Sequence, residues 1–196
     1  NCLQVAEGPA RDFWEAIQLW HIATNMIIAE SNGHSVTYGR FDKIFYPYYK
    51  KDIETGNLTR EFMQELIENF YIKIWDLNKL RSHILIKTFG NGGVGGAALT
   101  VGGVDKQGMD ATNDLTYMML DAHVHTRLPC PWLAVRMHNN TPRSLKIKVA
   151  NVIRLGTGEP KIFNDEVTIP SMLTTGVELT DARNYQVVGC VEPDVS

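Results

Sequence analysis

The sequence predicts an α/β fold, in which helices alternate with short strands and cover a sheet or a barrel. Apolar residues recur at helical spacing in several segments, and short apolar runs typical of buried strands lie between them. Turn-forming residues separate the two kinds of segment. The 196 residues contain no internal repeat, low-complexity tract or linker, so we expect one domain or a little more.

The first part of the chain is predicted to be helical. A helix is expected to begin near Pro9 and to end in the turn-forming residues 30–35. A second helix, rich in aromatic residues, is expected over residues 40–51, before a break at residues 55–57. Thr59 is placed to cap a third helix. The apolar stripes of the first and third helices comprise Phe13, Ile17, Trp20, Thr24 and Ile27, and Met63, Leu66, Ile67, Phe70 and Ile74.

Glycine marks the middle of the chain, where residues 90–108 hold eight of the sixteen glycines. Within this window, residues 97–101 predict a short buried strand. A helix is expected over residues 112–125 and a further strand over residues 133–137. The many glycines indicate backbone that turns tightly or packs closely against a ligand or another segment.

The last part alternates short helices with short strands. Thr141-Pro142 predicts a capped helix with proline at its first position, which ends near residue 155. A strand is expected at residues 161–163, and brief helices near residues 169–174 and 180–185. The segment Val187-Val188-Gly189-Cys190 follows them.

Composition excludes several classes of function. The 19 Lys and Arg residues nearly balance the 22 Asp and Glu residues, and a net charge of -3 offers no footprint for nucleic acid or an anionic membrane. No apolar run approaches the roughly 20 residues that span a bilayer. Cys2, Cys130 and Cys190 stand far apart, which argues against a disulfide framework or a zinc knuckle and favours a reducing cytosol. The chain starts at Asn1 without a signal-peptide pattern, and both ends are expected to be cut rather than natural.

Two patterns suggest cofactors, but their contexts argue against them. Gly90-x-Gly92-x-x-Gly95 has the letters of a dinucleotide fingerprint, yet a strand-like segment follows where that site needs a helix. Asp121, His123 and His125 suggest a metal, but residues two apart on a helix do not share a face. No third ligand stands at a recognisable spacing, so we expect neither a nucleotide nor a metal on this chain.

Cys190 is the strongest candidate for chemistry. A lone cysteine is more often a small buried apolar residue, but Gly189 frees the backbone before it and Pro193 stiffens the chain after it. In an extended segment, Glu192 would point to the same side as Cys190. A neighbouring carboxylate disfavours formation of a thiolate, which is wrong for a cysteine hydrolase and suits a neutral S–H that exchanges hydrogen atoms. Glu192 is then free to transfer protons.

The residues around Cys190 resemble a motif of a known family. The segment Val188-Gly189-Cys190-Val191-Glu192-Pro193 resembles the cysteine loop of the pyruvate formate-lyase-like glycyl radical enzymes, in the branch with Cys-Val-Glu. Similar segments occur in the same order along nearly the whole chain. They are residues 30–35, 39–42, 46–52, 99–103, 110–115 and 163–165.

The resemblance implies a barrel of about ten strands wrapped by helices, with the cysteine on a loop at its centre. Residues 1–196 would form part of that barrel, and its N-terminal part and the C-terminal glycyl radical domain would lie elsewhere. The implied cofactor is a glycyl radical of the protein itself, generated by a radical-SAM activating enzyme. In this scheme Cys190 shuttles hydrogen atoms and Glu192 moves protons while a neighbouring group leaves. The segment alone would be inactive.

Further expectations follow from the same resemblance. His34 and Ser35 match positions that contact substrate hydroxyls, and Gly96 stands where relatives often carry an aromatic residue, so the pocket is expected to be wider. A dehydratase or a C–N or C–S lyase is expected, with an arylacetate decarboxylase or another C–C lyase as the alternative. The family further implies a small-molecule substrate, a homodimer, and a cytoplasmic or microcompartment location.

Two hypotheses from other classes stay open. Cys190 as a thiolate, acting with a distant histidine, would make the protein a hydrolase or transferase. A non-catalytic binding or structural domain would explain the absence of a radical loop from these residues.

Overall fold

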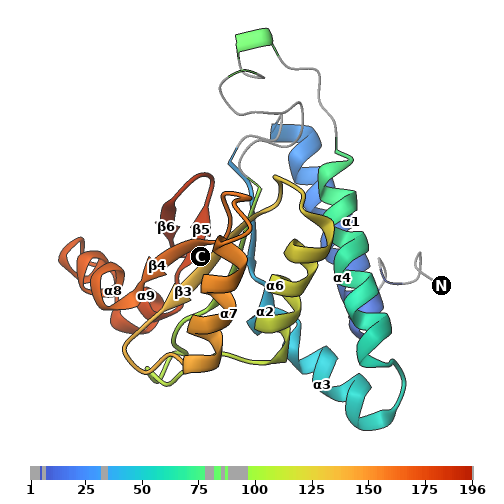
Figure 1. The fold of residues 1–196 in the computed structure, drawn as a ribbon, viewed down its shortest axis with the longest axis horizontal. Helices are drawn as coiled ribbons and strands as arrows, with labels where there is room; N and C mark the ends of the chain where they lie inside the picture. Colours follow the sequence, from blue (N-terminus) through green and yellow to red (C-terminus); the bar gives the residue numbers. More distant parts are fainter. Residues whose placement is uncertain are drawn as a thin grey trace.

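Four parallel strands form the main sheet of the protein, in the spatial order β1-β2-β3-β4 (Figure 1). They are β1 (Thr37–Arg40), β2 (Ala98–Gly102), β3 (Trp132–Met137) and β4 (Lys161–Asn164). The predicted strands at residues 97–101, 133–137 and 161–163 are therefore confirmed. This computed structural model describes residues 5, 8–31, 35–77, 82–84, 87 and 97–195.

Strand β1 corrects the sequence analysis, which placed no strand before the second helix. The segment is short, contains Gly39 and ends in Arg40, so it lacks the apolar run that marks a strand. Arg40 is nevertheless buried. Its guanidinium donates to the carbonyls of Gly102 (2.8 Å) and Val104 (3.0 Å), which satisfies part of its hydrogen-bonding capacity far from water.

The helices before β2 follow the predicted pattern with two changes of boundary. Helix α1 spans Phe13–Ser31, and the expected second helix is split into α2 (Phe41–Ile44) and α3 (Tyr46–Thr55). A left-handed Gly56 ends α3. Helix α4 spans Arg60–Trp75, and the hydroxyl of its N-cap, Thr59, accepts a hydrogen bond from the amide of Phe62, as predicted.

The later helices alternate with strands. They are α6 (Asp114–Thr126), α7 (Arg143–Ile153), α8 (Asp165–Thr174) and α9 (Leu179–Arg183). The expected cap of α7 is wrong: Pro142 itself occupies the N-cap position, and Thr141 Oγ1 accepts the amide of His138 at 2.8 Å instead. Helix α8 begins four residues earlier than expected, because Asn164 caps it by accepting the amide of Glu166.

The main sheet has two different faces. Successive side chains of β3 point to opposite sides, so Leu133 and Val135 join the large core with α6 and α7, which lie in front of the sheet in Figure 1. Ala134 faces the other way and packs with Tyr185 and Val187 in a second, smaller cluster. The second face is therefore covered by the segment that leads to Cys190.

That segment forms a separate hairpin, β5 (Gln186–Val188) and β6 (Glu192–Asp194), in which Val188 pairs with Glu192. Strand β5 lies against β1 and β2 without joining their ladder.

Over the part of the chain that the structure describes, no helix is both long and apolar enough to cross a membrane.

Candidate functional site around the Cys190 hairpin

Cys190 lies in the tight turn of the β5–β6 hairpin. Gly189, Cys190 and Val191 connect the two strands, and Gly189 adopts a left-handed conformation with φ +58°. The amide of Val191 donates to Glu192 Oε2 at 2.9 Å, which fixes this carboxylate beside the turn. The expectation that Cys190 and Glu192 share one face of an extended strand is therefore wrong, because the chain reverses at Cys190. The Cys190 side chain is half-buried and forms no disulfide.

Ser35 and Glu192 meet on the two sides of Gly189. A Cβ atom on Gly189 would lie 2.8 Å from Glu192 Oε2 and 3.0 Å from both Cβ and Oγ of Ser35. Ser35 itself has a positive φ of 60°, which is uncommon for a residue with a side chain. The structure thus brings Ser35, Gly189 and Glu192 together at the turn that carries Cys190. His34 and Gly96 lie outside the described residues.

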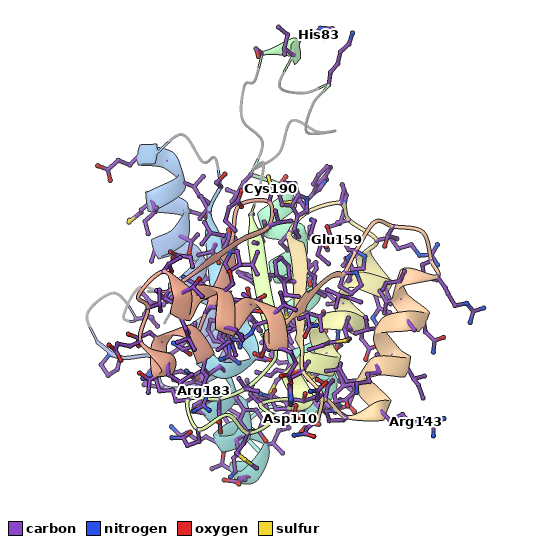
Figure 2. The ribbon with its side chains drawn as sticks, turned by 90° about the vertical axis from the view of Figure 1, so that its left-hand side faces the viewer. His83, Asp110, Arg143, Glu159, Arg183 and Cys190 are labelled. Carbon is purple, nitrogen blue, oxygen red and sulfur yellow. The ribbon has the colours of Figure 1, made fainter. Side chains whose placement is uncertain are left out.

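This cluster lies at the N-terminal edge of the parallel sheet. Ser35 precedes β1 by two residues, and Glu159, which accepts the amide of Leu133 at 3.1 Å, marks the same edge near the start of β3. Figure 2 shows Cys190 and Glu159 toward one end of the strands and Arg183 and Asp110 toward the other. The segment from Arg183 to Cys190 therefore crosses the sheet face from its C-terminal edge toward its N-terminal edge.

Thr100 and Arg136 hold the hairpin in place, and the sequence analysis did not identify either residue. Thr100 Oγ1 accepts the amide of Val187 at 2.9 Å. Arg136 donates to the carbonyls of Tyr185 and Arg183, each at 2.9 Å. A charged residue in the middle of an otherwise apolar strand was the available signal for Arg136, because burial of a charge requires a partner.

The partner of Arg136 is Asp165, with two hydrogen bonds of 2.9 and 2.8 Å between fully desolvated side chains. Tyr185 closes the group: its hydroxyl donates to Asp165 Oδ1 at 2.8 Å, and its ring lies 3.8 Å from the guanidinium carbon of Arg136. Burial, followed by the nearby Asp165 charge, raises the pKa of Tyr185. The Arg136 side chain fits here only because residue 103 is a glycine: a Cβ on Gly103 would lie 2.6 Å from Arg136 Nε.

A second buried acid lies beside this group. Asp42 Oδ2 accepts the amide of Gly102 and the hydroxyl of Thr116, both at 2.6 Å. Burial raises the pKa of Asp42, and the Arg40 charge opposes that shift. Burial also lowers the pKa of Arg40 to about 10, with the Arg136 charge as the next cause. These groups lie at the C-terminal edge of the sheet, far from Cys190, and they brace the fold.

The three residues that suggested a metal site, Asp121, His123 and His125, each contact a different partner. His123 Nε2 bonds Thr157 Oγ1 at 2.9 Å inside the core, whereas His125 Nδ1 bonds Glu68 at 2.6 Å on the surface. Asp121 pairs with Lys148. Among residues 5, 8–31, 35–77, 82–84, 87 and 97–195, no group of three His, Cys, Asp or Glu side chains is arranged to hold a metal ion.

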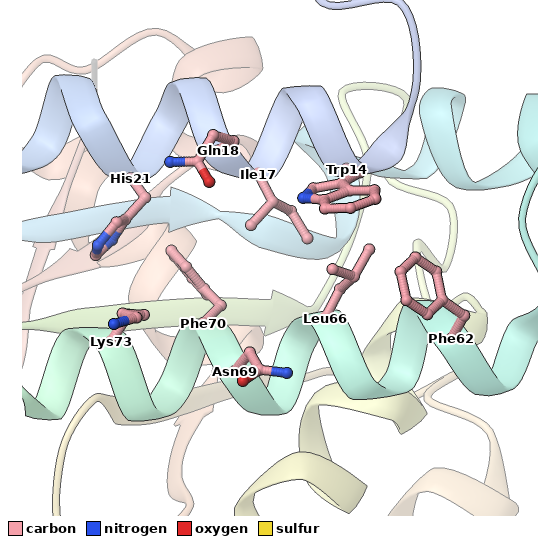
Figure 3. Close-up of a pocket in the computed structure, with 9 residues that line it drawn as sticks. All are labelled: Trp14, Ile17, Gln18, His21, Phe62, Leu66, Asn69, Phe70 and Lys73. Carbon is pink, nitrogen blue, oxygen red and sulfur yellow. The ribbon is translucent and has the colours of Figure 1, made fainter. Parts of the chain in front are cut away.

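A groove of about 350 Å³ lies elsewhere, between α1 and α4 (Figure 3). It is mainly apolar, with His21 and Lys73 at one end. Its lining residues belong to the two helices and to neither strand of the Cys190 hairpin, so this groove is separate from the candidate site. The lining comprises Trp14, Ile17, Gln18, His21, Phe62, Leu66, Asn69, Phe70 and Lys73.

The chain is similar in sequence and in fold to several known proteins. The chain is 48% identical to (2S)-3-sulfopropanediol dehydratase of Klebsiella oxytoca, over all of this chain and 24% of that protein. A solved structure concerned with 1,2-propanediol dehydration in Roseburia inulinivorans matches 97% of this chain and 24% of its own, with a TM-score of 0.93 and 43% identity. The glycerol-bound, B12-independent glycerol dehydratase of Clostridium butyricum matches 95% of this chain and 23% of its own, with a TM-score of 0.88 and 45% identity.

The chain thus spans about a quarter of the length of these relatives. The matched part of the two solved structures has the fold described above, a parallel sheet covered by helices, and the sequence prediction of an α/β fold is confirmed. The family model described as pyruvate formate lyase-like matches residues 1–196, that is, the whole of this chain. The resemblance stated from the sequence is therefore confirmed, and the chain belongs to the pyruvate formate lyase-like family of glycyl radical enzymes.

Proposed function

We propose that this chain is part of a longer glycyl radical lyase that removes water from a small diol. Cys190 is its hydrogen-atom shuttle and Glu192 its proton-transfer group. One observation carries this proposal: the hairpin turn presents a half-buried thiol, a carboxylate and the Ser35 hydroxyl around a single glycine. The dehydratase names of the relatives support it.

The residues of this chain suit that chemistry. The glycyl radical, on a residue elsewhere in the protein, would supply the unpaired electron by taking the hydrogen atom of the Cys190 thiol. As a thiyl radical, Cys190 would take a hydrogen atom from a substrate carbon, and the resulting thiol would return one to the product radical. The thiyl radical formed in that return would regain a hydrogen atom from the glycine, which restores both the thiol and the glycyl radical. Glu192 accepts a proton from one hydroxyl group and passes it to the neighbouring hydroxyl, which leaves as water. Ser35 lies close enough to hold a substrate hydroxyl beside Glu192.

The substrate class is proposed from the family resemblance and from the names of the relatives. His34 and Ser35 are proposed to bind hydroxyl groups, and Gly96 to leave a wider wall than an aromatic residue would. A wider wall suits a diol with a bulky polar substituent, as in the sulfonated diol named for the relative from Klebsiella oxytoca. Other leaving groups are the second possibility, because an isethionate sulfite-lyase of Oleidesulfovibrio alaskensis is 38% identical over 97% of this chain.

The architecture and partners are proposed on the same basis. The main sheet is proposed to be part of a ten-stranded barrel with the Cys190 hairpin inside it. Within the described residues, no strand pairs with the outer edges of β1 and β4, which leaves both edges open to further strands. We further propose activation by a radical-SAM enzyme, assembly as a homodimer, and a location in the cytoplasm or a bacterial microcompartment.

The test is an anaerobic electron paramagnetic resonance spectrum of the complete gene product after incubation with its activating enzyme. We expect a glycyl radical signal, and then dehydration of (2S)-3-sulfopropanediol, 1,2-propanediol or glycerol. Cys190→Ala should abolish turnover, whereas the matched control Cys130→Ala should retain it, because Cys130 is buried in the main core. Turnover by Cys190→Ala would rule the proposal out.

The other classes of function give different results in the same samples. A thiolate enzyme predicts activity that tolerates oxygen and rapid labelling of Cys190 by iodoacetamide near neutral pH. A non-catalytic domain predicts neither a radical signal nor turnover, even with an activator that works on a known relative.

A further inference from the structure

The Cys190 hairpin is too small to hold its own position. Strands β5 and β6 contain three residues each and form a sheet of two strands. An isolated hairpin of this kind is marginally stable in water. Since β5 adds to no ladder of the four-stranded sheet in the described part of the chain, side-chain contacts must determine where the hairpin lies.

Thr100 supplies the central contact. Its hydroxyl oxygen accepts the amide of Val187, three residues before Cys190, at 2.9 Å. Thr100 is 0% exposed and Val187 1% exposed, so water cannot replace the bond if the hydroxyl is removed. Because strand side chains alternate, Leu99 and Val101 point into the main core and only Thr100 of this trio faces β5.

A second contact with the hairpin segment, further from Cys190, comes from the group of Arg136, Asp165 and Tyr185. Arg136 binds the carbonyl of Tyr185, and Asp165 binds the Tyr185 hydroxyl, so both the backbone and the side chain of that residue are fixed. The pair of Arg136 and Asp165 is almost fully buried, with exposed fractions of 0% and 2% for the two side chains. Tyr185 stands immediately before β5.

We propose that Thr100, supported by the Tyr185 group, is a positioning residue that sets the distance from Cys190 to the substrate carbon. Neither residue touches the reacting atoms. Only Val188 and Gly189 separate Val187 from Cys190, so a shift of β5 along the sheet moves the turn with it. A shift of about 1 Å in a reacting group can lower a rate on the order of 100-fold. This inference rests on the proposed function, since it assumes that the thiol must reach a substrate C–H bond.

The test uses the complete activated enzyme with Thr100→Val, Thr100→Ser and Tyr185→Phe. Valine keeps the shape of threonine without the acceptor, and serine keeps the acceptor. Glycyl radicals are counted by electron paramagnetic resonance, and kcat is expressed per radical. Each measurement is repeated with carbon-deuterated (2S)-3-sulfopropanediol, 1,2-propanediol and glycerol, because a misplaced thiol makes hydrogen-atom abstraction slower and more fully rate-limiting.

We expect Thr100→Val to form the radical in normal yield and to lose about 10- to 100-fold in kcat per radical, with a larger deuterium isotope effect. Thr100→Ser should restore both values, and Tyr185→Phe should change them in the same direction by less. A purely structural role would lower radical yield or protein yield and leave kcat per radical and the isotope effect unchanged, which would overturn the inference. If Thr100→Val cannot be purified, an unchanged isotope effect in Tyr185→Phe overturns it instead. If the wild-type enzyme turns over none of the three substrates, the proposed function fails first, and this inference fails with it.

Discussion

Gly189 packs directly against the side chain of Ser35, so that a Cβ on Gly189 would lie 3.0 Å from Ser35 Oγ. The two residues are far apart in the sequence, and both have positive φ, +58° and +60°. The absence of a side chain at position 189 is therefore what allows the turn of Cys190 to lie against the start of β1.

Gly189→Ala is expected to displace this turn. The new Cβ would also lie 2.8 Å from Glu192 Oε2, and a left-handed conformation costs a residue with a side chain about 1–2 kcal/mol. We expect kcat per glycyl radical to fall on the order of 10-fold or more in the complete enzyme. Gly176→Ala is the matched control, because Gly176 has φ +90° with nothing within 4 Å of its Cβ position. Equal activity of the two variants would contradict the packing argument.

Glu192→Gln is expected to separate radical formation from elimination. The amide keeps the size of the side chain but cannot accept the substrate proton, so the glycyl radical should form while dehydration falls at least about 100-fold. Spin counts and product release measured in the same sample check this. Asp194→Asn, which changes another exposed carboxylate on the same strand, should leave dehydration unchanged. Normal dehydration by Glu192→Gln would remove Glu192 from the proposed site.

Asp165→Asn is expected to loosen the whole hairpin. Loss of one partner leaves the Arg136 charge buried and uncompensated, which typically costs about 3–5 kcal/mol. We expect a lower midpoint of thermal unfolding and faster hydrogen–deuterium exchange at the amides of β5. The exposed pair of Lys50 and Glu54, with 3.8 Å between its charged atoms, provides the control. Glu54→Gln should change stability by less than about 1 kcal/mol.

His123 makes stability depend on pH. Burial lowers its pKa from the usual 6.5, so the unfolded chain binds a proton that the folded chain resists. The stability that this histidine contributes is therefore complete above pH 6.5 and is lost as the pH falls through the lowered, folded value. His123→Gln cannot take up the proton and should lose less in unfolding midpoint between pH 7 and pH 5. A His123→Gln curve parallel to that of the wild type would refute the assignment.

Elements whose apolar residues recur at regular spacing were predicted well. In α4, Met63, Ile67, Phe70 and Ile74 are buried as the stripe requires, and Thr59 caps the helix. In α1, Phe13, Ile17 and Thr24 of the predicted stripe are buried, whereas Ile27 is 59% exposed. Strand β1 was missed because its stability comes from contacts of Arg40 with residues more than sixty positions away, which no local pattern records.

In the candidate site too, some residues could be identified from the sequence and others could not. The sequence identifies Cys190, Glu192 and Ser35, because a short motif and a family resemblance single them out. The reversal of the chain at Cys190 was not predicted, because the pattern of apolar and polar residues does not reveal that Val188 pairs with Glu192. Thr100 was missed for a different reason: its partner, Val187, is 87 residues further along the chain.

The segment that carries Cys190 is anchored at one edge of the sheet and ends at the other. Arg136, Asp165 and Tyr185 lie at the C-terminal edge, and Cys190 lies toward the N-terminal edge. Substitutions beside Cys190 are therefore expected to alter which molecule fits the proposed site without disturbing the hydrogen bonds of Arg136 and Asp165. The two edges are thus expected to evolve separately: substitutions at one edge change the molecule that fits the proposed site, while the buried hydrogen bonds at the other edge are inherited unchanged.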